Sequence, residues 1–436
     1  MEPDSPAPAN PSSPDAGSRR PPRRREPREG SDAHAGERPA HREPRRDGPP
    51  RRGPSSGGGG GRERNGPGGR GERKDRPEQA AAPAREAVAA TTTAQDATDR
   101  ENLRGPLLAA VSRSFSLSIN LLPEPLRDPI ALGYLLARAL DTIADGDTAP
   151  VEERLGHLRA MLEMFKYGAD PAALRAIAKG ASKQTHPGER ELLTKLPALF
   201  AWYESLEGAD RWDLGRTLSR IGYGQELDLR RFGKAAEPGG VTALATARET
   251  QDYAYFVAGS AGELWTRLCE RHLPGYSKLP GEEMLELGKR LGQGLQLVNI
   301  LRDLPKDLAA GRCYLPAEDL AAAGLTVDDL KKEPARARPV IAKWRAAAVE
   351  HLDAGWRYVQ AVKASKLRYA VALPALLAVR TLELLAKTSS LETDAPVKVD
   401  RAALKRLMLT SAAANLLAPP LLDRLYRGPR NKAAAA

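Results

Sequence analysis

Leu295-Gln-Leu-Val-Asn-Ile-Leu-Arg-Asp-Leu-Pro-Lys-Asp307 is an apolar helical pattern that ends in two carboxylates, Asp303 and Asp307. Residues four apart share one face of a helix, where like charges oppose each other by about 0.2–0.5 kcal/mol. A second pair with the same spacing, Asp141 and Asp145, ends an apolar pattern far upstream. One such pair is common on a solvated face. Two pairs, each with an arginine close by, predict a metal ion and a polyanion between them.

The beginning of the chain differs in composition from the rest. Before Leu103 there is no Leu, Ile, Phe, Tyr or Trp, and Val88 is the only branched aliphatic residue. Such a segment cannot bury enough apolar surface to offset the loss of chain entropy on folding. We therefore expect residues 1–100 to be a disordered tail, residues 101–425 to form one domain, and residues 426–436 to be a disordered C-terminus.

Beyond the tail the hydrophobic periodicity is helical, and no run of residues shows a convincing strand alternation. A long helix over 125–145 leads into the first aspartate pair, and another is expected over 242–272. A third covers 281–304, where Pro305 should kink or end it because proline lacks a backbone donor. The pattern predicts an all-α fold with its helices stacked as a bundle.

Two glycines, Gly259 and Gly262, fall in the middle of the helix expected over 242–272. Each costs about 1 kcal/mol relative to alanine in a helix interior. Tight packing between helices explains them as well as close approach of a substrate to the backbone does. Both explanations stay open on the sequence alone.

Charge and cysteine content limit the class of protein. The net charge is +11 and the pI about 9.6, but acidic residues are interspersed through the arginine-rich tail, which has no aromatic residue for base stacking. We expect a loose attraction to anionic surfaces and no specific nucleic-acid binding. Cys269 and Cys313 lie in patterns that read as helix or helix edge, without the spacing of a zinc site, and indicate a reducing compartment.

The sequence also predicts where the protein resides. The N-terminus has no apolar signal region, and its acidic residues disfavour a transit peptide. The uncharged run from Leu407 to Leu422 contains two prolines and is shorter than the roughly 20 apolar residues of a spanning helix. We expect a soluble, cytoplasmic monomer, with peripheral contact to the inner face of the cell membrane as a further expectation.

The two aspartate pairs suit a particular chemistry. Magnesium prefers oxygen ligands and is usually held by one or two carboxylates together with substrate phosphates. Two pairs that face one cavity could hold such ions against a diphosphate and help it leave. Arg138 precedes Asp141 by one turn, Arg302 adjoins Asp303, and guanidinium groups suit phosphate oxygens. Alternatively, these arginines neutralise the aspartates directly as ion pairs on the helix.

Several segments, taken in order, resemble the squalene/phytoene synthase family over about residues 103–390. They are Ser112-Arg-Ser-Phe115, Tyr134 to Asp145, Tyr253 to Gly262, Gln296 to Asp307, and Arg312-Cys-Tyr-Leu-Pro316. The joint resemblance is specific, although no single segment is. It implies a single-domain all-α isoprenoid synthase fold, with both aspartate motifs at the mouth of a deep apolar cavity.

The resemblance also assigns roles to residues. It implies four magnesium ligands: Asp141, Asp145, Asp303 and Asp307. Residues that hold the diphosphate, or support the second aspartate pair beside it, would be Ser112, Arg113, Ser114, Arg138, Arg302, Gln296 and Asn299. Aromatic residues near the reacting carbons would be Tyr253, Tyr134 and Phe115. Aromatic faces stabilise a cation in a dry cavity, which makes these positions physically sensible.

Within the family, the segment from Leu136 to Asp145 is similar to that of squalene synthases, whereas phytoene synthases typically carry a doubled basic residue before the first aspartate. A bacterial member of the squalene synthase branch fits best. The implied reaction joins two farnesyl diphosphates head to head through presqualene diphosphate and reduces the product with NADPH. The nicotinamide follows from the resemblance alone, because no Gly-x-Gly-x-x-Gly motif follows a strand.

Alternatives remain within and outside the family. Phytoene, dehydrosqualene or hydroxysqualene synthase would share the same motifs, and the side chains that set cavity depth cannot be placed from one sequence. From a different class, the chain could be a non-catalytic helical scaffold whose basic tail binds RNA or lipid. The two intact, mutually repulsive aspartate pairs argue against a scaffold, since nothing in that role requires them.

Overall fold

The computed structural model describes residues 99–112, 115–145, 149–233, 240–388, 390–393 and 397–435, without the side chains of Phe115 and Leu117. The predicted disordered tail lies outside these residues, apart from the last two positions of its range. Arg113 and Ser114, two of the residues expected to hold a diphosphate, also lie outside them.

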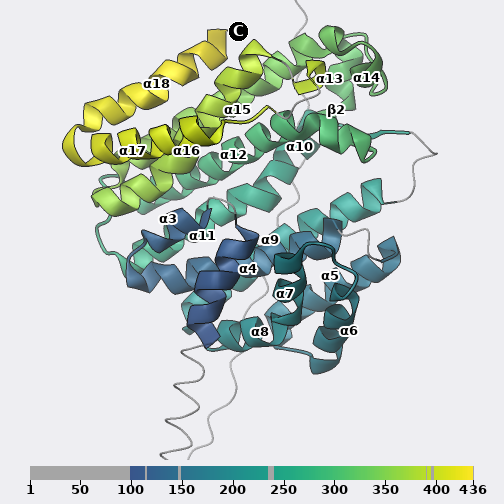
Figure 1. Cartoon of the computed structure of the whole chain (residues 1–436), viewed down its shortest axis with the longest axis vertical. Helices are drawn as coiled ribbons and strands as arrows, with labels where there is room; N and C mark the ends of the chain where they lie inside the picture. The colour runs from purple at the N-terminus through teal and green to yellow at the C-terminus, as the bar shows by residue number, and fades with distance from the viewer. Residues whose placement is uncertain are drawn as a thin grey trace, which may run out of the picture. The chain divides into compact units, whose positions relative to one another are not determined.

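The described chain is almost entirely helical, which confirms the predicted all-α class (Figure 1). Its first helices are η1 (Leu103–Leu107), α2 (Leu108–Val111), α3 (Phe115–Asn120), α4 (Glu124–Asp145), α5 (Val151–Tyr167), α6 (Pro171–Ala181), α7 (Pro187–Thr194), α8 (Leu196–Glu204) and α9 (Gly208–Phe232). The later ones are α10 (Ala247–Ala254), the π-helix η2 (Tyr255–Gly259), α11 (Ser260–His272), α12 (Gly281–Ala309), α13 (Ala317–Ala322), α14 (Asp329–Lys332), η3 (Pro334–Ala337), α15 (Arg338–Ala361), α16 (Ser365–Lys387), η4 (Ser390–Glu392), α17 (Arg401–Leu417) and α18 (Pro419–Ala435).

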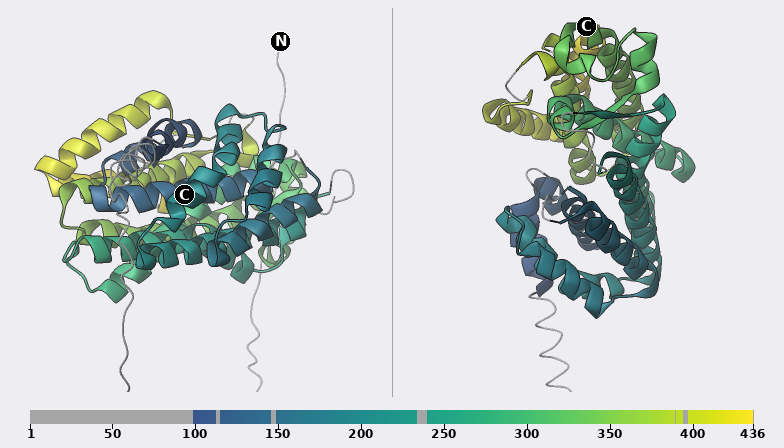
Figure 2. Two further views of the ribbon diagram at one scale, coloured as in Figure 1. Left: turned by 90° about the horizontal axis from the view of Figure 1, so that it is seen from below. Right: turned by 90° about the vertical axis from the view of Figure 1, so that its right-hand side faces the viewer.

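Helix α12 is the element on which the rest of the bundle is built. It packs against α11, α15 and α16, while α4 packs against α9 and α5 (Figures 1 and 2). Apolar side chains at three- and four-residue steps, among them Met284, Leu287, Leu291 and Val298, are buried along α12. This stripe faces the neighbouring helices and continues through Leu304 and Leu308, so the second aspartate pair lies on a packed part of the helix.

Pro305 does not end helix α12, so of the two predicted outcomes, a kink or a helix end, the helix end is wrong. The helix continues to Ala309 with the proline inside it. A proline cannot donate to the carbonyl four residues earlier, which here belongs to Leu301. The hydroxyl of Ser390, on η4, donates to that carbonyl oxygen at 2.8 Å. A side chain from a distant segment therefore satisfies the acceptor that the proline leaves free, and Asp307 stays on the same helix as Asp303.

The single helix predicted over residues 242–272 is also corrected. Its first residues form strand β1 (Thr242–Leu244), which pairs in parallel with β2 (Arg312–Pro316). Thr246 then caps α10 by accepting from the Glu249 backbone amide, a Thr-x-x-Glu signal that the sequence contains. Cys313 therefore lies in a strand and not at a helix edge. Both cysteines are free and buried.

The C-terminal end is helical, although residues 426–436 were expected to be disordered. Helix α18 extends to Ala435 and packs against α16 and α17. Tyr426 stacks on Trp356 with ring centroids 4.3 Å apart, and its hydroxyl donates to Asp353. Arg430 forms an ion pair with the same aspartate. These contacts explain why the C-terminal segment is ordered. They cannot be seen in short-range periodicity of the sequence.

Helix α16 is long and apolar enough to cross a membrane by length and composition alone. Its most apolar window has a mean hydropathy of 1.6, but 67% of that window is buried within the fold. The core helix of a soluble protein passes the same test.

Candidate active site

A polar cavity of about 280 Å³ collects side chains from six separate elements. Helix α4 contributes the first aspartate pair and α12 the second, while α9, α10, η2 and β2 supply the rest of the wall. Its charged and polar lining residues are Asp141, Asp145, Gln225, Asp228, Tyr253, Gln296, Asn299, Arg302, Asp303, Lys306, Asp307, Arg312 and Tyr314. The structure therefore brings the two predicted aspartate pairs to one cavity.

In two of these aspartates, Asp141 and Asp307, the surroundings disfavour the charged form. Burial, together with the neighbouring Asp145 carboxylate, raises the pKa of Asp141 to about 7. Burial likewise raises the pKa of Asp307 to about 6, although the Arg312 guanidinium opposes that shift. Carboxylates whose charged form is disfavoured in this way gain most from a cation placed between them.

Arg312 supplies one such cation. Its Nη1 lies 3.0 Å from Asp145 Oδ1 and its Nη2 lies 3.2 Å from Asp307 Oδ1, so it bridges the two aspartate pairs. Burial lowers the pKa of Arg312, but the nearby Tyr314 hydroxyl and the Asp145 and Asp307 carboxylates outweigh burial, so the pKa lies above its ordinary value. The sequence interpretation assigned no role to this residue, since its partners are remote in the chain.

The two arginines predicted to hold a diphosphate are already paired. Arg302 forms two hydrogen bonds to Asp303, at 2.8 Å and 2.5 Å, as the ion-pair alternative describes. Arg138 pairs with Glu189 on α7 and lies 4.0 Å from Asp141. A phosphate would have to compete with these carboxylates or displace them, and their part in diphosphate binding stays a prediction.

A buried network of Asp228, Tyr253 and Tyr314 forms one wall of the cavity. Tyr253 was predicted from the sequence, whereas Asp228 and Tyr314 were not. Tyr314 Oη donates to Asp228 Oδ2 at 2.6 Å, and the rings of Tyr253 and Tyr314 stack with centroids 4.5 Å apart. Burial raises the pKa of Asp228 to about 7, and its second oxygen, Oδ1, has no hydrogen-bond partner among the described residues. The alternation of strand β2 turns Arg312 and Tyr314 to the same side, toward this cavity.

The amide side chains contribute in different ways. Gln225, on α9, donates to Asp141 Oδ1 at 2.5 Å and so fixes the orientation of the first pair. The predicted residues Gln296 and Asn299 lie together on α12, where the Asn299 amide donates to Gln296 at 3.3 Å. Both line the polar cavity beside the second pair. Gln225 was missed because nothing in its own segment distinguishes it from an ordinary polar helix residue.

The remaining predicted residues lie elsewhere. Ser112 is buried and donates to the Leu108 carbonyl at 2.6 Å, and it does not line the polar cavity. Phe115 begins α3, but its side chain is outside the described part of the chain. Tyr134 lies on α4, between two apolar cavities, with its hydroxyl 3.4 Å from the Val111 carbonyl.

Two apolar cavities adjoin the polar one. The first, of about 370 Å³, runs between α11, α12, α15 and α16, and the second, of about 260 Å³, lies between α4, α9 and α11. Both are lined by Tyr134, Val257 and Trp265, and Val257 also lines the polar cavity. Asn299 belongs to the first apolar cavity and the polar one, and Asp141 to the second and the polar one. Three compartments thus meet around Val257.

The meeting point lies on irregular backbone. Val257 belongs to the π-helix η2, a form of helix that occurs often at functional sites. Close backbone packing holds it in place: a Cβ on Gly292 would lie 2.2 Å from the Ala258 carbonyl oxygen, and one on Gly262 would lie 2.0 Å from the Gly288 carbonyl oxygen. Tight helix packing therefore accounts for Gly262, which also lines the first apolar cavity.

The sequence profile of squalene/phytoene synthases matches residues 108–406, which is most of the chain and includes every element around the three cavities. The chain belongs to the squalene/phytoene synthase family. The family resemblance seen in the motifs is thereby confirmed.

Curated relatives in this family carry several names. The chain is 25% identical to a squalene synthase of Schizosaccharomyces pombe over 283 residues, which is 63% of this chain and 57% of that protein. It is 29% identical to a presqualene diphosphate synthase of Rhodopseudomonas palustris, over 50% of this chain and 64% of that protein. A bifunctional lycopene cyclase/phytoene synthase of Colletotrichum graminicola is also 29% identical, over 52% and 36%. The match thus spans less than two thirds of each of these relatives.

Solved structures in the family share the fold. TcSQS in complex with the ligand E5700 has a TM-score of 0.58 and 25% sequence identity, and the match covers 77% of this chain and 98% of that one. A dehydrosqualene synthase in complex with a ligand has a TM-score of 0.53 and 19% identity, over 74% and 99%. The helical bundle is therefore the fold expected for an isoprenoid synthase.

Family membership implies magnesium, and the residues at the polar cavity fit it. Within the described residues, no three Asp, Glu, His or Cys side chains meet closely enough to form a metal shell by themselves. Magnesium does not need such a shell, because it keeps several waters and takes the remaining ligands from substrate phosphates. Two pairs of carboxylates on facing helices, with raised pKa values at Asp141 and Asp307, are a suitable donor set for ions that arrive with a diphosphate.

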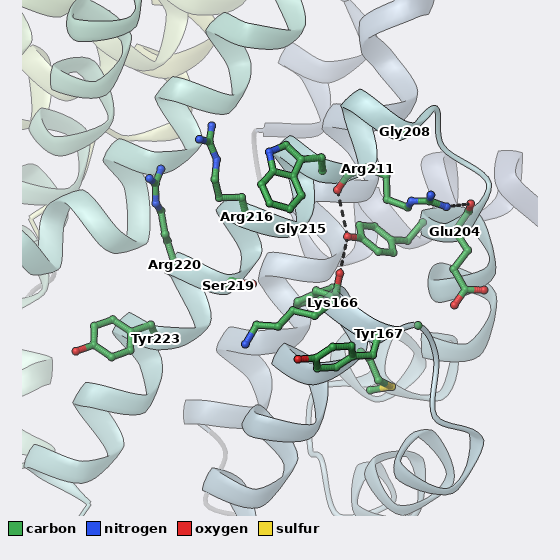
Figure 3. Close-up of a pocket in the computed structure, with 15 residues that line it drawn as sticks. Lys166, Tyr167, Glu204, Gly208, Arg211, Gly215, Arg216, Ser219, Arg220 and Tyr223 are labelled. Atoms are coloured by element: carbon green, nitrogen blue, oxygen red, sulfur yellow. Dashed lines mark hydrogen bonds between the residues drawn. The ribbon is translucent and has the colours of Figure 1, made fainter. Parts of the chain in front are cut away.

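A larger open groove, of about 960 Å³, lies on the opposite side of α9 from the second apolar cavity. Figure 3 shows Arg216, Arg220 and Tyr223 along one wall of this groove, facing Lys166 and Tyr167. These three cations already have carboxylate partners. Arg216 pairs with Asp213, Arg220 with Glu263, and Lys166 with Glu163. The groove contains neither aspartate pair, so it is not the candidate active site.

Proposed function

We propose that this chain is a squalene synthase, which condenses two farnesyl diphosphates head to head through presqualene diphosphate and reduces that intermediate with NADPH. The observation that carries the proposal is the pair of apolar cavities that meet the polar cavity at Val257. A head-to-head condensation needs two prenyl chains with their diphosphate ends together and their tails apart. Two separate apolar compartments that open on one aspartate-lined compartment suit that requirement.

The polar cavity would hold the diphosphate ends. Asp141, Asp145, Asp303 and Asp307 are the residues that would hold magnesium, which would withdraw electrons from the diphosphate and help it leave. Arg312 is placed to exchange its carboxylate partners for phosphate oxygens once metal neutralises the aspartates. Gln225 keeps Asp141 oriented toward the cavity during that exchange.

The apolar walls would protect the carbocation that forms when a diphosphate leaves. Tyr134 and Trp265 line both apolar cavities, and aromatic faces attract a cation at close range. Few polar atoms line these compartments, which keeps water from capturing the cation.

Closing the cyclopropane ring of presqualene diphosphate forms two carbon–carbon bonds, expels one diphosphate and releases one proton. The buried network offers a path for that proton. Tyr253 lines the polar cavity and interacts with Asp228, to which the Tyr314 hydroxyl also donates a hydrogen bond. A carboxyl group whose pKa is raised to about 7 is a suitable final acceptor near neutral pH.

NADPH is proposed from the family resemblance alone. Among the described residues no glycine-rich loop follows a strand into a helix in the manner of a dinucleotide site, so no residue is assigned to the hydride donor. A second candidate function follows from the relatives: the enzyme would stop at presqualene diphosphate, as the name of the Rhodopseudomonas palustris relative implies for that protein.

Product analysis separates these functions. The purified protein is incubated with farnesyl diphosphate and magnesium, with and without NADPH, and in parallel with geranylgeranyl diphosphate. Squalene that forms only with NADPH supports the main proposal. Presqualene diphosphate that persists when NADPH is present supports the second. Phytoene from geranylgeranyl diphosphate, or no turnover of either substrate, contradicts both.

A further inference from the structure

The end of the α17–α18 hairpin exposes apolar side chains to an unusual degree. Among the described residues, Leu409, Leu416, Leu417 and Leu421 are 65%, 71%, 80% and 45% exposed. Pro419 and Pro420, the first two residues of α18, are exposed as well. We call these four leucines and two prolines the leucine tip. A compact apolar patch of this kind on a folded chain marks an interaction site.

The hairpin is held so that the leucine tip faces outward. On the inner side of α17, the Asn415 amide donates to the Ser365 carbonyl at 2.8 Å, and Arg368 donates to the Asn415 side-chain oxygen at 2.8 Å. Tyr369 donates to the Met408 carbonyl at 2.9 Å. These contacts fix the rotation of α17 about its axis. The leucines therefore cannot turn inward to the core without losing hydrogen bonds to α16.

The outer face of α17 also carries positively charged side chains. Arg401, Lys405 and Arg406 are exposed at the beginning of α17, and none of them forms an ion pair within the part of the chain that the structure describes. Between Arg401 and Leu422 the sequence contains no acidic residue. The outer face of α17 is thus cationic at one end and apolar at the other. That is the pattern of a helix that lies at the interface of an anionic membrane.

We propose that the leucine tip docks on an anionic lipid bilayer, with its leucines at the boundary of the acyl chains and the three cations at the lipid phosphates. The unpaired cations favour this occupant over an apolar protein surface, which would leave them without counter-charges. The position of the hairpin beside α16 also supports docking on a lipid bilayer. Residues Ala370, Val371 and Pro374, which follow Arg368 and Tyr369 on α16, line the first apolar cavity.

This placement goes beyond the proposed reaction. It brings the wall of an apolar cavity within a few residues of a membrane-bound helix, so an apolar molecule could pass between bilayer and cavity with little exposure to water. Docking itself does not depend on turnover and can be measured without it.

Vesicle sedimentation tests the proposal with the full chain. Binding is measured to vesicles of phosphatidylglycerol mixed with phosphatidylcholine, and to vesicles of phosphatidylcholine alone. The wild-type chain should prefer the anionic vesicles. L416E/L417E should weaken binding to them by about tenfold or more, and L416S/L417S should also weaken it, which separates lost insertion from charge repulsion. K405E/R406E should reduce the preference for anionic lipid.

A matched control uses the other exposed aromatic and apolar side chains of the fold. Trp212 and Tyr167 are exposed beside the groove on α9, so Y167E/W212E places two charges on a different face, and its affinity should stay within about twofold of wild type. The basic N-terminal tail is present in every variant and contributes equally. Unchanged vesicle binding in both leucine variants overturns the proposal. So does a dimer, seen by light scattering, that the same substitutions dissociate.

Discussion

Arg312 donates a hydrogen bond of 3.0 Å to Asp145, a residue 167 positions earlier in the chain. The same guanidinium reaches Asp307 at 3.2 Å, so one cation joins the carboxylates of α4 to those of α12. Without it, the other cations near the four aspartates of the polar cavity, among the described residues, would be Arg138, Arg302 and Lys306. A magnesium ion in the polar cavity could reduce the repulsion between these carboxylates.

Replacing Arg312 by alanine should therefore couple stability to metal. In EDTA, Arg312→Ala should lower the free energy of unfolding by about 1–3 kcal/mol, since a partly buried cation is lost from a group of carboxylates. Magnesium should restore more stability to the variant than it adds to the wild type. Thermal unfolding with and without magnesium measures both effects.

Arg248→Ala is the control for that comparison. Arg248 forms an exposed ion pair with Asp252 one turn away, and its removal should change stability by less than about 0.5 kcal/mol, with no effect of magnesium. If the two variants lose the same stability and respond alike to magnesium, the Arg312 bridge across the polar cavity does not contribute to stability.

Asp228 predicts a pH dependence of stability. Burial raises its pKa to about 7, above the ordinary value of 3.8. Between these pH values the folded chain keeps a proton that the unfolded chain releases. The contribution of Asp228 to the free energy of unfolding therefore falls as pH rises from about 4 to about 7.

Asp228→Asn removes that dependence, because an amide does not ionise. The variant should gain stability relative to the wild type as pH rises, by up to about 4 kcal/mol over the full range. Urea unfolding of both proteins in EDTA, at a series of pH values from 5 to 8 (about 2–3 kcal/mol of that range), gives the difference directly. If the free energy of unfolding changes with pH in parallel for the two proteins, the Asp228 carboxyl does not have a raised pKa in the folded chain.

Gly262 tests the packing of η2 and α11 on α12. A Cβ there would lie 2.0 Å from the Gly288 carbonyl oxygen, so Gly262→Ala should destabilise the fold by about 1–3 kcal/mol and disturb the first apolar cavity. Gly105, which has no atom within 4 Å of an added Cβ, is the matched control. Gly105→Ala should be neutral or stabilising by about 0.4–1 kcal/mol in chemical denaturation. Equal effects at the two positions would refute close packing at Gly262.

Deletion of residues 1–95 should leave turnover within about twofold of the full chain. The described fold begins at Asp99, and Arg100 already donates to Ser205 at 3.0 Å. Steady-state kinetics of the two proteins under identical conditions provide the test. A large loss of turnover would show that the expected disordered tail takes part in catalysis.

The sequence predicted the fold class and the aspartate pairs because both signals are local. Helical periodicity and an i,i+4 spacing need only a few consecutive residues. Pro305 misled the prediction of a helix end, because the Ser390 hydroxyl that satisfies the Leu301 carbonyl comes from a remote segment. The same limit applies to strand β2, whose pairing partner, β1, lies about seventy residues earlier.

Remote partners also explain why the sequence did not predict several residues of the polar cavity. Asp228 and Gln225 carry no local motif, and Tyr314 lies in the segment Arg312–Pro316, which resembles the family but gave this tyrosine no role. Each gains its role only from a partner on another element. The Thr246 and Glu249 cap of α10 is different, because its Thr-x-x-Glu spacing was legible in the sequence and would have divided the long predicted helix correctly.

The central claim is that two aspartate pairs and a metal ion expel diphosphate from a prenyl substrate. Asp303→Asn keeps the size of the side chain and the helix that carries it, but removes a charge that would hold magnesium. Far-UV circular dichroism should not change. Glu163→Gln, in an exposed ion pair with Lys166, is the matched control and should retain full activity.

The most direct measurement is the rate of diphosphate release from farnesyl diphosphate in the presence of magnesium, for the wild-type chain, Asp303→Asn and Glu163→Gln. We predict release by the wild type and by Glu163→Gln, and a fall of about 100-fold or more for Asp303→Asn. Release by Asp303→Asn at the wild-type rate would contradict the account and leave the aspartate pair as a solvated helix face.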